Sequence, residues 1–346
     1  MIPTTIDDIT AEWLTDSAGL PCHTAEVTQI GVGIGVSSAL YRVRLTGDGC
    51  PDSVVVKLPA LDEAAVFTST ILRMYIREVH FFEQLGCEVP VRIPTFHHAE
   101  VDEETSRFVV VMEDLGQLRC VDQLEGMDLA DAEQAVDALA RWHAQWWGRA
   151  EAMATAGLTV HLGDPIYPAV LPSVFAEGWA KLTAEHDLPA SIRDIGPHFA
   201  DSIAHLLADL AQEPTTLCHG DYRADNMLFD DTGQPALLDF QLIGTGSGVY
   251  DLAYFATQSL RSEDAAAHER RLFDRWCDGL EAGGVADLDR EAEWLRYRKA
   301  ALFCLVYPVV ACRGMDLSDP RQRALIECMD TRFSRAVEQL DLVELL

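Results

Sequence analysis

The first third of the chain alternates short apolar runs with turns that are rich in glycine, proline and aspartate. Runs of β-branched residues bounded by such turns are typical of strands. The pattern predicts strands at Val27–Ile30, Leu40–Leu45, Ser53–Leu58 and Phe108–Met112. Between the third and fourth, residues 63–85 carry apolar side chains at near-helical spacing, and Gly86 follows as an expected stop. We therefore expect three strands, one long helix and at least one further strand.

From about residue 128 the pattern becomes mainly helical, beginning with an amphipathic stretch that Asp128 or Asp131 can cap. Residues 151–198 contain five prolines and look less regular, so they are expected to form a lid or a substrate-facing segment. Two short apolar pieces, Met227–Phe229 and Ala236–Leu238, flank an Asp-Asp-Thr-Gly turn and predict a small hairpin. Helices are expected again after Asp251.

The length of 346 residues suggests about two structural units, at roughly 150 residues per domain. The change from strands to helices places their boundary near Gly116, giving lobes 1–115 and 116–346. Nine scattered cysteines include no CxxC pair and are expected to be reduced thiols. The N-terminus lacks a basic signal region, and no apolar run is long enough to span a membrane, so we expect a cytoplasmic protein.

The net charge of −30 gives nucleic acids and anionic membranes a low prior as partners, because like charges repel. The basic residues are almost all arginine, and the only lysines are Lys57, Lys181 and Lys299. Lys57 ends the apolar strand Val-Val-Val-Lys. Arginine and lysine have different chemistry, so a lysine retained at this strand end is a candidate for a specific role as a compact cation.

The most informative stretch is His219-Gly-Asp-Tyr-Arg-Ala-Asp-Asn226, followed by Asp239-Phe-Gln241. A hairpin between these two motifs would bring the side chains of Asp221, Asn226 and Asp239 to its open end. One carboxylate can accept a proton, while an amide and a second carboxylate offer the hard oxygen ligands that Mg²⁺ prefers. Phosphoryl transfer from a nucleotide requires this combination of groups.

These motifs resemble the catalytic loop and metal motif of the protein-kinase-like superfamily, in its aminoglycoside phosphotransferase and choline- or ecdysteroid-kinase-like branch. The resemblance implies a bilobal α+β fold with an N-terminal antiparallel sheet plus helix and a larger helical lobe. It implies that Asp221 is the catalytic base, that Asn226 and Asp239 hold magnesium, and that His219 and Asp251 support the loop.

Other parts of the resemblance occur in the required order between about residues 27 and 260. A glycine-rich hairpin loop is expected to cover the phosphates of ATP, and the next strand brings Lys57 to them, with Glu78 as its carboxylate partner. The strand that ends near Glu113 resembles the hinge that holds adenine. The residues expected to bind nucleotide are Gly33, Gly35, Ser37, Ser38, Lys57, Glu78, Glu113 and Leu115.

Only eleven residues separate Asp239 from Asp251, which is too short for the activation segment of a protein kinase, so a small-molecule hydroxyl is the expected acceptor. No lysine sits in a Walker A motif, and the glycine loop leads into a strand pattern, which disfavours a dinucleotide fold. Two alternatives remain open. One is an inactive nucleotide-binding module, and the other is a metal-dependent hydrolase that would use His219, Asp221, Asp225 and Asp239.

The identity of the acceptor is left open by the residues. The acidic composition would suit a cationic acceptor such as an aminoglycoside or choline. The tryptophans and the apolar segment 300–312 would equally suit a lipophilic alcohol such as a sterol or a macrolide, and the Glu-Asp-Leu-Gly and Ala-Arg-Trp-His-Ala-Gln-Trp-Trp segments favour this second option slightly. The acceptor site is expected between 151–200 and 290–316.

Overall fold

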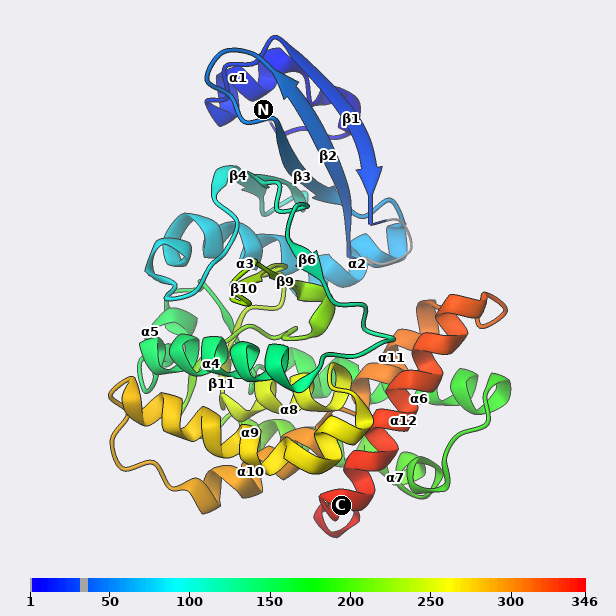
Figure 1. Ribbon diagram of the computed structural model, residues 1–346. Coiled ribbons are helices and arrows are strands. Elements are labelled where there is room, and N and C mark those ends of the chain that lie inside the picture. Colours follow the sequence, from blue (N-terminus) through cyan, green and yellow to red (C-terminus); the bar gives the residue numbers. More distant parts are fainter. Residues whose placement is uncertain (1, 32–36) are drawn as a thin grey trace. The chain divides into compact units, whose positions relative to one another are not determined.

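The computed structural model describes residues 2–31 and 37–346, which form two compact units (Figure 1). The first unit comprises Met1–Arg119 and Ala236–Leu242, and the second comprises Cys120–Pro235 and Ile243–Leu346. The division after Arg119 lies near the boundary expected at Gly116. The assignment of Ala236–Leu242 to the first unit was not expected. It arises because the Phe240 ring stacks on Phe81 at 3.9 Å and the Leu237 amide donates to the Arg92 carbonyl.

The first unit is built on a five-stranded antiparallel sheet with the order β1-β2-β3-β5-β4. The strands are β1 (Thr24–Ile30), β2 (Ser38–Thr46), β3 (Ser53–Pro59), β4 (Phe96–Asp102) and β5 (Arg107–Glu113). All four predicted strands are present, which confirms the α+β class. Strand β4 was missed because its sequence, Phe-His-His-Ala-Glu-Val-Asp, has few of the β-branched residues by which strands were recognised.

One hydrophobic cluster of the first unit lies between this sheet and the N-terminal helix α1 (Ala11–Ala18). Thr10 caps that helix by accepting a hydrogen bond from the Trp13 amide. Alternate residues of β2 point into the core, as expected for a strand with one buried face. Val54, Val56 and Leu58 of β3 join them. Strand β3 therefore has a fixed register, which determines where Lys57 on the opposite face must point.

The single helix predicted over residues 63–85 is wrong in detail. The chain forms α2 (Glu63–Ile71) and α3 (Met74–His80), separated by Arg73, which adopts a left-handed conformation with φ 54°. A π-helical turn, Phe81–Leu85, follows α3, and a 3₁₀ turn replaces the expected stop at Gly86. The apolar spacing was close to helical across the break, so the pattern alone did not reveal it.

The second unit is mostly helical, and its first long helix is α4 (Leu129–Trp146), which Asp128 caps through the Asp131 amide. The irregular segment expected at 151–198 is instead largely helical. It contains α5 (Ala150–Thr155), α6 (Ile166–Glu185) and the first part of α7 (Ala190–Leu210). Pro165 and Pro189 precede the first turns of α6 and α7, where proline is tolerated. Packing of α6 on α7 and α11 outweighs the unfavourable Pro172 inside the helix.

The remaining helices of this unit are α8 (Val249–Gln258), α9 (Ser262–Ala282), α10 (Arg290–Phe303), α11 (Val306–Gly314) and α12 (Pro320–Gln339). A small sheet joins β7 (Val160–His161), β11 (Gly244–Gly246) and β8 (Thr216–Cys218). Strands β9 (Met227–Phe229) and β10 (Pro235–Leu237) lie where the hairpin was predicted, and the turn between them is closed by a hydrogen bond from the Asp230 amide to the Gln234 carbonyl. The short strand β6 is Arg119–Cys120. Among the described helices, none has the length and apolar composition needed to cross a membrane.

Candidate phosphoryl-transfer site

Lys57 lies in the first unit at the centre of a buried ion cluster. Its side chain is 4% exposed, and Nζ lies 2.8 Å from Oε1 of Glu78 on α3 and 2.9 Å from Oδ1 of Asp239. Burial lowers the pKa of Lys57, but the carboxylates of Asp239 and Glu78 raise it by more, so the ammonium stays charged. Burial also raises the pKa of Glu78 to about 7, and Lys57 limits that rise. The structure therefore brings together three of the predicted site residues.

Asp239 keeps its carboxylate accessible while it binds Lys57. Its side chain is 33% exposed, and its backbone is left-handed with φ 63°. Phe240, the next residue, is fully buried against Phe81 and Phe82. The buried ring anchors the segment, so the neighbouring carboxylate is held in one place at the edge of the hydrophobic core.

Gln241 contacts the two serines that were predicted to bind nucleotide. Ser37 Oγ donates to Oε1 of Gln241 at 2.5 Å, and Nε2 of Gln241 donates to Ser38 Oγ. These contacts tie the start of β2 to the segment that carries Asp239. The predicted phosphate-covering glycines, Gly33 and Gly35, lie outside the described residues.

The side chains of the two predicted hinge residues, Glu113 and Leu115, make contacts within the protein itself. The Glu113 carboxylate accepts hydrogen bonds from Arg92 at 2.6 Å and from the Thr95 amide at 3.0 Å. Leu115 is 3% exposed. The next residue after Glu113, Asp114, holds Arg42, Ser53 and the Gly116 amide. The side chains near the hinge are thus occupied by the protein itself, and a role for Glu113 in nucleotide binding stays a prediction that concerns its backbone.

In the second unit, Asp251 binds the backbone of the loop that carries His219, Gly220 and Asp221. One carboxylate oxygen of Asp251 accepts from the His219 amide at 2.6 Å, and the other accepts from the Gly220 amide at 2.9 Å. Gly220 has φ 85°, a left-handed conformation that glycine adopts without a steric penalty. The His219 ring is buried, and its Nδ1 accepts from the Asp221 amide. The role of His219 and Asp251 in supporting the catalytic loop stays a prediction, and these hydrogen bonds are the contacts on which it depends.

Asp251 is itself held by a chain of neutral side chains. His143 on α4 lies 3.1 Å from Asp251, and Trp276 on α9 donates its Nε1–H to Nδ1 of His143 at 3.0 Å. Because the indole can only donate, Nδ1 of His143 must accept, and its proton must be on Nε2, facing Asp251. Cys218 lies close enough to complete a cluster of the kind that can hold a metal ion, but both ring nitrogens of His143 are engaged in hydrogen bonds, Nδ1 with Trp276 and Nε2 with Asp251. In this structure the cluster is a hydrogen-bonded support.

Asp221 projects from this loop with its side chain 16% exposed. Nε of Arg223 lies 3.1 Å from Oδ1 of Asp221, and Nδ2 of Asn226 donates to Oδ2 of Asp221 at 2.7 Å. The same Asn226 nitrogen donates to the Asp221 carbonyl. Both of these hydrogen bonds use the side-chain nitrogen of Asn226, which directs its carbonyl oxygen away from Asp221. This orientation fits a role for that oxygen as a ligand for a hard cation.

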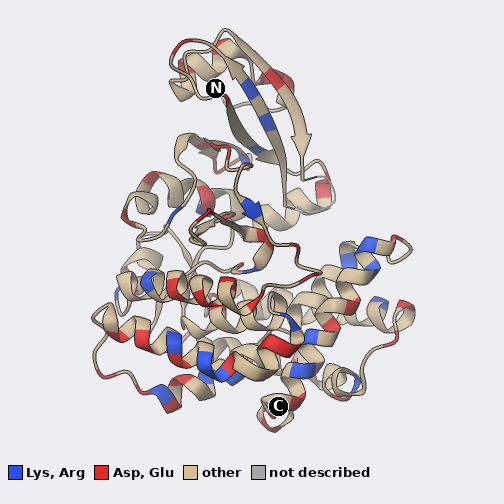
Figure 2. Cartoon of the chain, viewed as in Figure 1, with Lys and Arg blue, Asp and Glu red and all other residues tan. Residues whose placement is uncertain are grey.

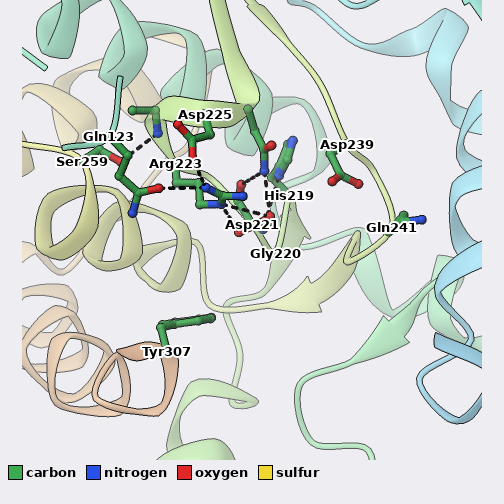
Figure 3. Close-up of polar contacts among 12 residues, drawn as sticks. Gln123, His219, Gly220, Asp221, Arg223, Asp225, Asp239, Gln241, Ser259 and Tyr307 are labelled. Atoms are coloured by element: carbon green, nitrogen blue, oxygen red, sulfur yellow. Dashed lines mark hydrogen bonds and ion pairs between the residues drawn. The ribbon is translucent and has the colours of Figure 1, made fainter. Parts of the chain in front are cut away.

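Arg223 is a site residue that sequence reasoning missed, although it lies inside the quoted motif two positions after Asp221. Figure 3 shows its guanidinium between Asp221, Asp225 and Gln123, and Gln123 accepts from Nη1 at 2.8 Å. Burial lowers the pKa of Arg223, but the carboxylates of Asp221 and Asp225 raise it by more. The only available signal was an arginine between two aspartates, which is too common in this acidic chain to single out.

One of three clustered tyrosines contacts Asp221 within the second unit. The rings of Tyr254 on α8 and Tyr307 on α11 stack at 3.8 Å, and the hydroxyls of Tyr250 and Tyr307 are hydrogen bonded. Burial raises the pKa of Tyr254 well above its usual range, and the Asp221 carboxylate, to which its hydroxyl is hydrogen bonded, raises it further. Burial likewise raises the pKa of Tyr250 and Tyr307, so these phenols stay protonated and the side of Asp221 that Tyr254 covers is aromatic and neutral.

The family model described as "Phosphotransferase enzyme family" matches residues 28–294. Among solved structures, macrolide 2'-phosphotransferase MphH from Brachybacterium faecium is 15% identical with a TM-score of 0.52, covering 94% of this chain and 98% of its own. Choline kinase from Cryptosporidium parvum is 10% identical with a TM-score of 0.56, covering 93% and 90%.

A third similar structure is the GDP complex of aminoglycoside 2'-phosphotransferase-IIIa, which is 17% identical with a TM-score of 0.54 and covers 93% of this chain and 96% of its own. At these identities the likeness shows the fold. No curated protein matches the chain.

Proposed function

The chain belongs to the phosphotransferase enzyme family, and on that premise we propose that it transfers the terminal phosphoryl group of ATP to a hydroxyl of a small molecule. The observation that carries the proposal is the buried Lys57, whose ammonium is held between Glu78 and Asp239. An isolated ammonium in the protein interior is costly, and this one is kept charged by two carboxylates. Such a fixed cation beside a partly exposed carboxylate suits the binding of nucleotide phosphates.

Each residue has a role in the proposed reaction. Lys57 contacts the phosphates, and Glu78 keeps its ammonium in place. Asp221 accepts a hydrogen bond from the acceptor hydroxyl and takes its proton as the oxygen attacks the γ-phosphorus and the bond to the β-phosphate oxygen breaks. Arg223 and Asn226 fix the direction of the Asp221 carboxylate through their hydrogen bonds.

We propose Asn226 and Asp239 as the magnesium ligands. Their side chains offer an amide oxygen and a carboxylate, which are hard oxygen donors suited to this ion. When bound, magnesium neutralises negative charge on the phosphates. The negative formal charge of the chain would otherwise disfavour the approach of a polyanionic nucleotide.

For the acceptor we propose a lipophilic alcohol. The support is Tyr254, whose hydroxyl is hydrogen bonded to Asp221, and the neutral aromatic cluster that Tyr254 forms with Tyr307 and Tyr250. Aromatic rings bind apolar ring systems through large contact areas. The positive charge of Arg223 is balanced by Asp221 and Asp225, so it adds little attraction for an anionic acceptor.

The test is a panel of lipophilic and cationic alcohols incubated with ATP or GTP and magnesium, with the products analysed by mass spectrometry for an added phosphate. Wild type is expected to phosphorylate a lipophilic alcohol with ATP, and Asp221→Ala is expected to lose about 10²–10⁴-fold in kcat. Asp230→Ala, which changes an exposed aspartate in the nearby turn, is the matched control and should retain activity.

The alternatives give different results in the same assay. Equal turnover by wild type and Asp221→Ala would refute the role of Asp221. Stabilisation by magnesium and ATP without any turnover across the panel would favour an inactive nucleotide-binding module. Hydrolytic activity that depends on zinc or manganese and is unaffected by nucleotide would favour a hydrolase. Turnover of cationic alcohols alone would refute the proposed acceptor class.

A further inference from the structure

Arg332 is a buried cation that the proposed reaction does not use. It lies on α12, is 3% exposed, and donates from Nη1 to the Gln258 carbonyl. Among the residues that the structure describes, no carboxylate lies within ion-pair distance of Arg332, and neither Nε nor Nη2 has a hydrogen-bond partner. Buried charges are normally paired. An unpaired guanidinium is notable in a chain with 56 acidic residues.

The surroundings of Arg332 leave its charge poorly compensated. Burial lowers the pKa of its guanidinium, and Cys328 and Asp225 oppose that effect only in part. Gly126 lies directly against it, and a Cβ at this glycine would be 2.6 Å from Nη2. Gly126 also has φ 74°, so a larger residue would be both strained and in collision. The guanidinium thus packs directly on the Gly126 backbone, and only glycine allows this approach.

Arg332 lines a cavity of about 550 Å³ in the second unit, together with the first residues of α9. Helix α9 begins at Ser262 after Arg261, and no side chain caps its N-terminus. The amide N–H groups of a first helical turn lack partners within the helix, and they attract anions together with the helix dipole. Two independent donors, the guanidinium and an uncapped helix of 21 residues, therefore meet at one cavity.

The rim of the cavity is acidic on balance. Glu125, Glu263 and Glu327 line it together with one cation, Arg261, and all four are exposed. Exposed carboxylates are screened by solvent, so each one repels an anion or attracts a cation only weakly, and a rim with three of them favours a cationic group. A ligand that carries charge of both signs would pair its anionic group with the buried Arg332 and its cationic group with the exposed glutamates of the rim. Figure 2 shows that acidic residues are widely distributed along the chain, so the acidic residues alone do not distinguish this cavity from the rest of the surface.

We propose that this cavity binds a small zwitterion outside the phosphoryl-transfer site. The phosphate or carboxylate head of the ligand contacts Arg332 and the first amides of α9, and its cationic end faces the glutamates of the rim. The cavity volume is within the range of 300–1,000 Å³ that small-molecule sites occupy. The binding claim does not depend on the proposed function.

The cavity wall is continuous with two contacts that hold the candidate catalytic loop. The first contact is next to Leu124 of the wall, because the preceding residue, Gln123, accepts a hydrogen bond from Arg223 (Figure 3). The second is next to Gln258, which Arg332 contacts, because the following residue, Ser259, accepts a hydrogen bond from the Ala224 amide. A bound zwitterion therefore stabilises the segments 122–127 and 258–263. This gives the site a structural signature that can be measured without any turnover.

The experiment uses the full chain without nucleotide and compares three probes: inorganic phosphate, ethanolamine, and O-phosphoethanolamine, which combines both charges. Calorimetry is expected to show the tightest binding for O-phosphoethanolamine. Arg332→Gln should weaken that binding at least tenfold, whereas Arg323→Gln, an exposed arginine of the same helix, should leave it unchanged. Amide hydrogen exchange should show protection at 122–127 and 258–263 when the probe is bound.

A second variant keeps the test decisive if Arg332→Gln does not fold. Ser262→Pro removes one amide donor at the first position of α9, where proline is tolerated, and it should weaken binding of the phosphate head. Equal binding by wild type and both variants, or protection confined to other segments, would overturn the site. Binding of phosphate as tight as that of O-phosphoethanolamine would overturn the role of the glutamate rim.

Discussion

Lys57 in the first unit and Asp221 in the second are both held by several neighbours, but the neighbours are of different kinds. Lys57 is fixed by two carboxylates in a buried environment. The loop of Asp221 is fixed by backbone amides that converge on Asp251, and Asp251 is held in turn by the neutral His143 and Trp276. The first arrangement depends on the charge states of titratable side chains, and the second depends mainly on hydrogen-bond geometry.

This difference has consequences for how each region responds to change. Ion clusters in the interior are sensitive to pH and to the loss of one partner, because the remaining charge is left without compensation. A hydrogen-bonded support responds to changes of shape or of donor and acceptor type. The following predictions test this distinction.

The largest expected effect is on activity in the first unit. Lys57→Met should reduce kcat/KM by at least about 100-fold, because the fixed cation at the phosphates is lost, and should destabilise the protein by about 3 kcal/mol. The double variant Lys57→Met with Glu78→Gln should recover most of the stability but none of the activity. Urea unfolding and ATP consumption measure the two effects. Lys299→Met is the control. If the double variant is as unstable as Lys57→Met alone, the ion-cluster interpretation is contradicted.

The second prediction concerns Asp251. Asp251→Asn places an amide NH₂ group against the backbone donors of His219 and Gly220, and it should destabilise the protein by about 3 kcal/mol. Urea unfolding measures the change, and Asp201→Asn on the exposed side of α7 should be close to neutral. If Asp251→Asn is as stable as wild type, the loop is held by other contacts.

The third prediction uses pH to separate the two regions. Burial raises the pKa of Glu78 to about 7 from 4.5, so the folded state binds this proton more tightly than the unfolded state. Protonation of Glu78 therefore stabilises the folded state. This contribution to the free energy of unfolding is complete below pH 4.5 and is lost as the pH rises through 7. Between pH 5.5 and 8, Glu78→Gln should remove about 1–2 kcal/mol of the pH-dependent change in the free energy of unfolding. An unchanged pH dependence would exclude Glu78 as the titrating group.

The smallest expected effect is at Trp276. Trp276→Phe removes the indole donor and leaves Nδ1 of His143 without its partner, which should cost about 1–2 kcal/mol in the free energy of unfolding. The control is Trp294→Phe, at a partly exposed position of α10. A loss at Trp276 no greater than that of the control would show that the imidazole does not need the indole to hold Asp251.

The sequence by itself determined the α+β class, four of the five strands of the first sheet, and the residue types of the site. Strand periodicity and the motif around His219 and Asp239 are local properties of the chain, so they are visible without a structure. The pairing of Lys57 with Glu78 was also predicted, on the resemblance, and the structure places the two side chains 2.8 Å apart.

Only the tertiary structure decided which residues act together across long separations in the chain. The break at Arg73 and the helices that contain Pro172 and Pro197 depend on packing, which outweighs local preference. Asp239 joins the first unit because Phe240 is buried there, and Arg223, Tyr254 and Arg332 gain their importance from neighbours that lie far away in sequence. Burial and charge compensation are properties of the folded chain, and therefore no local pattern could reveal them.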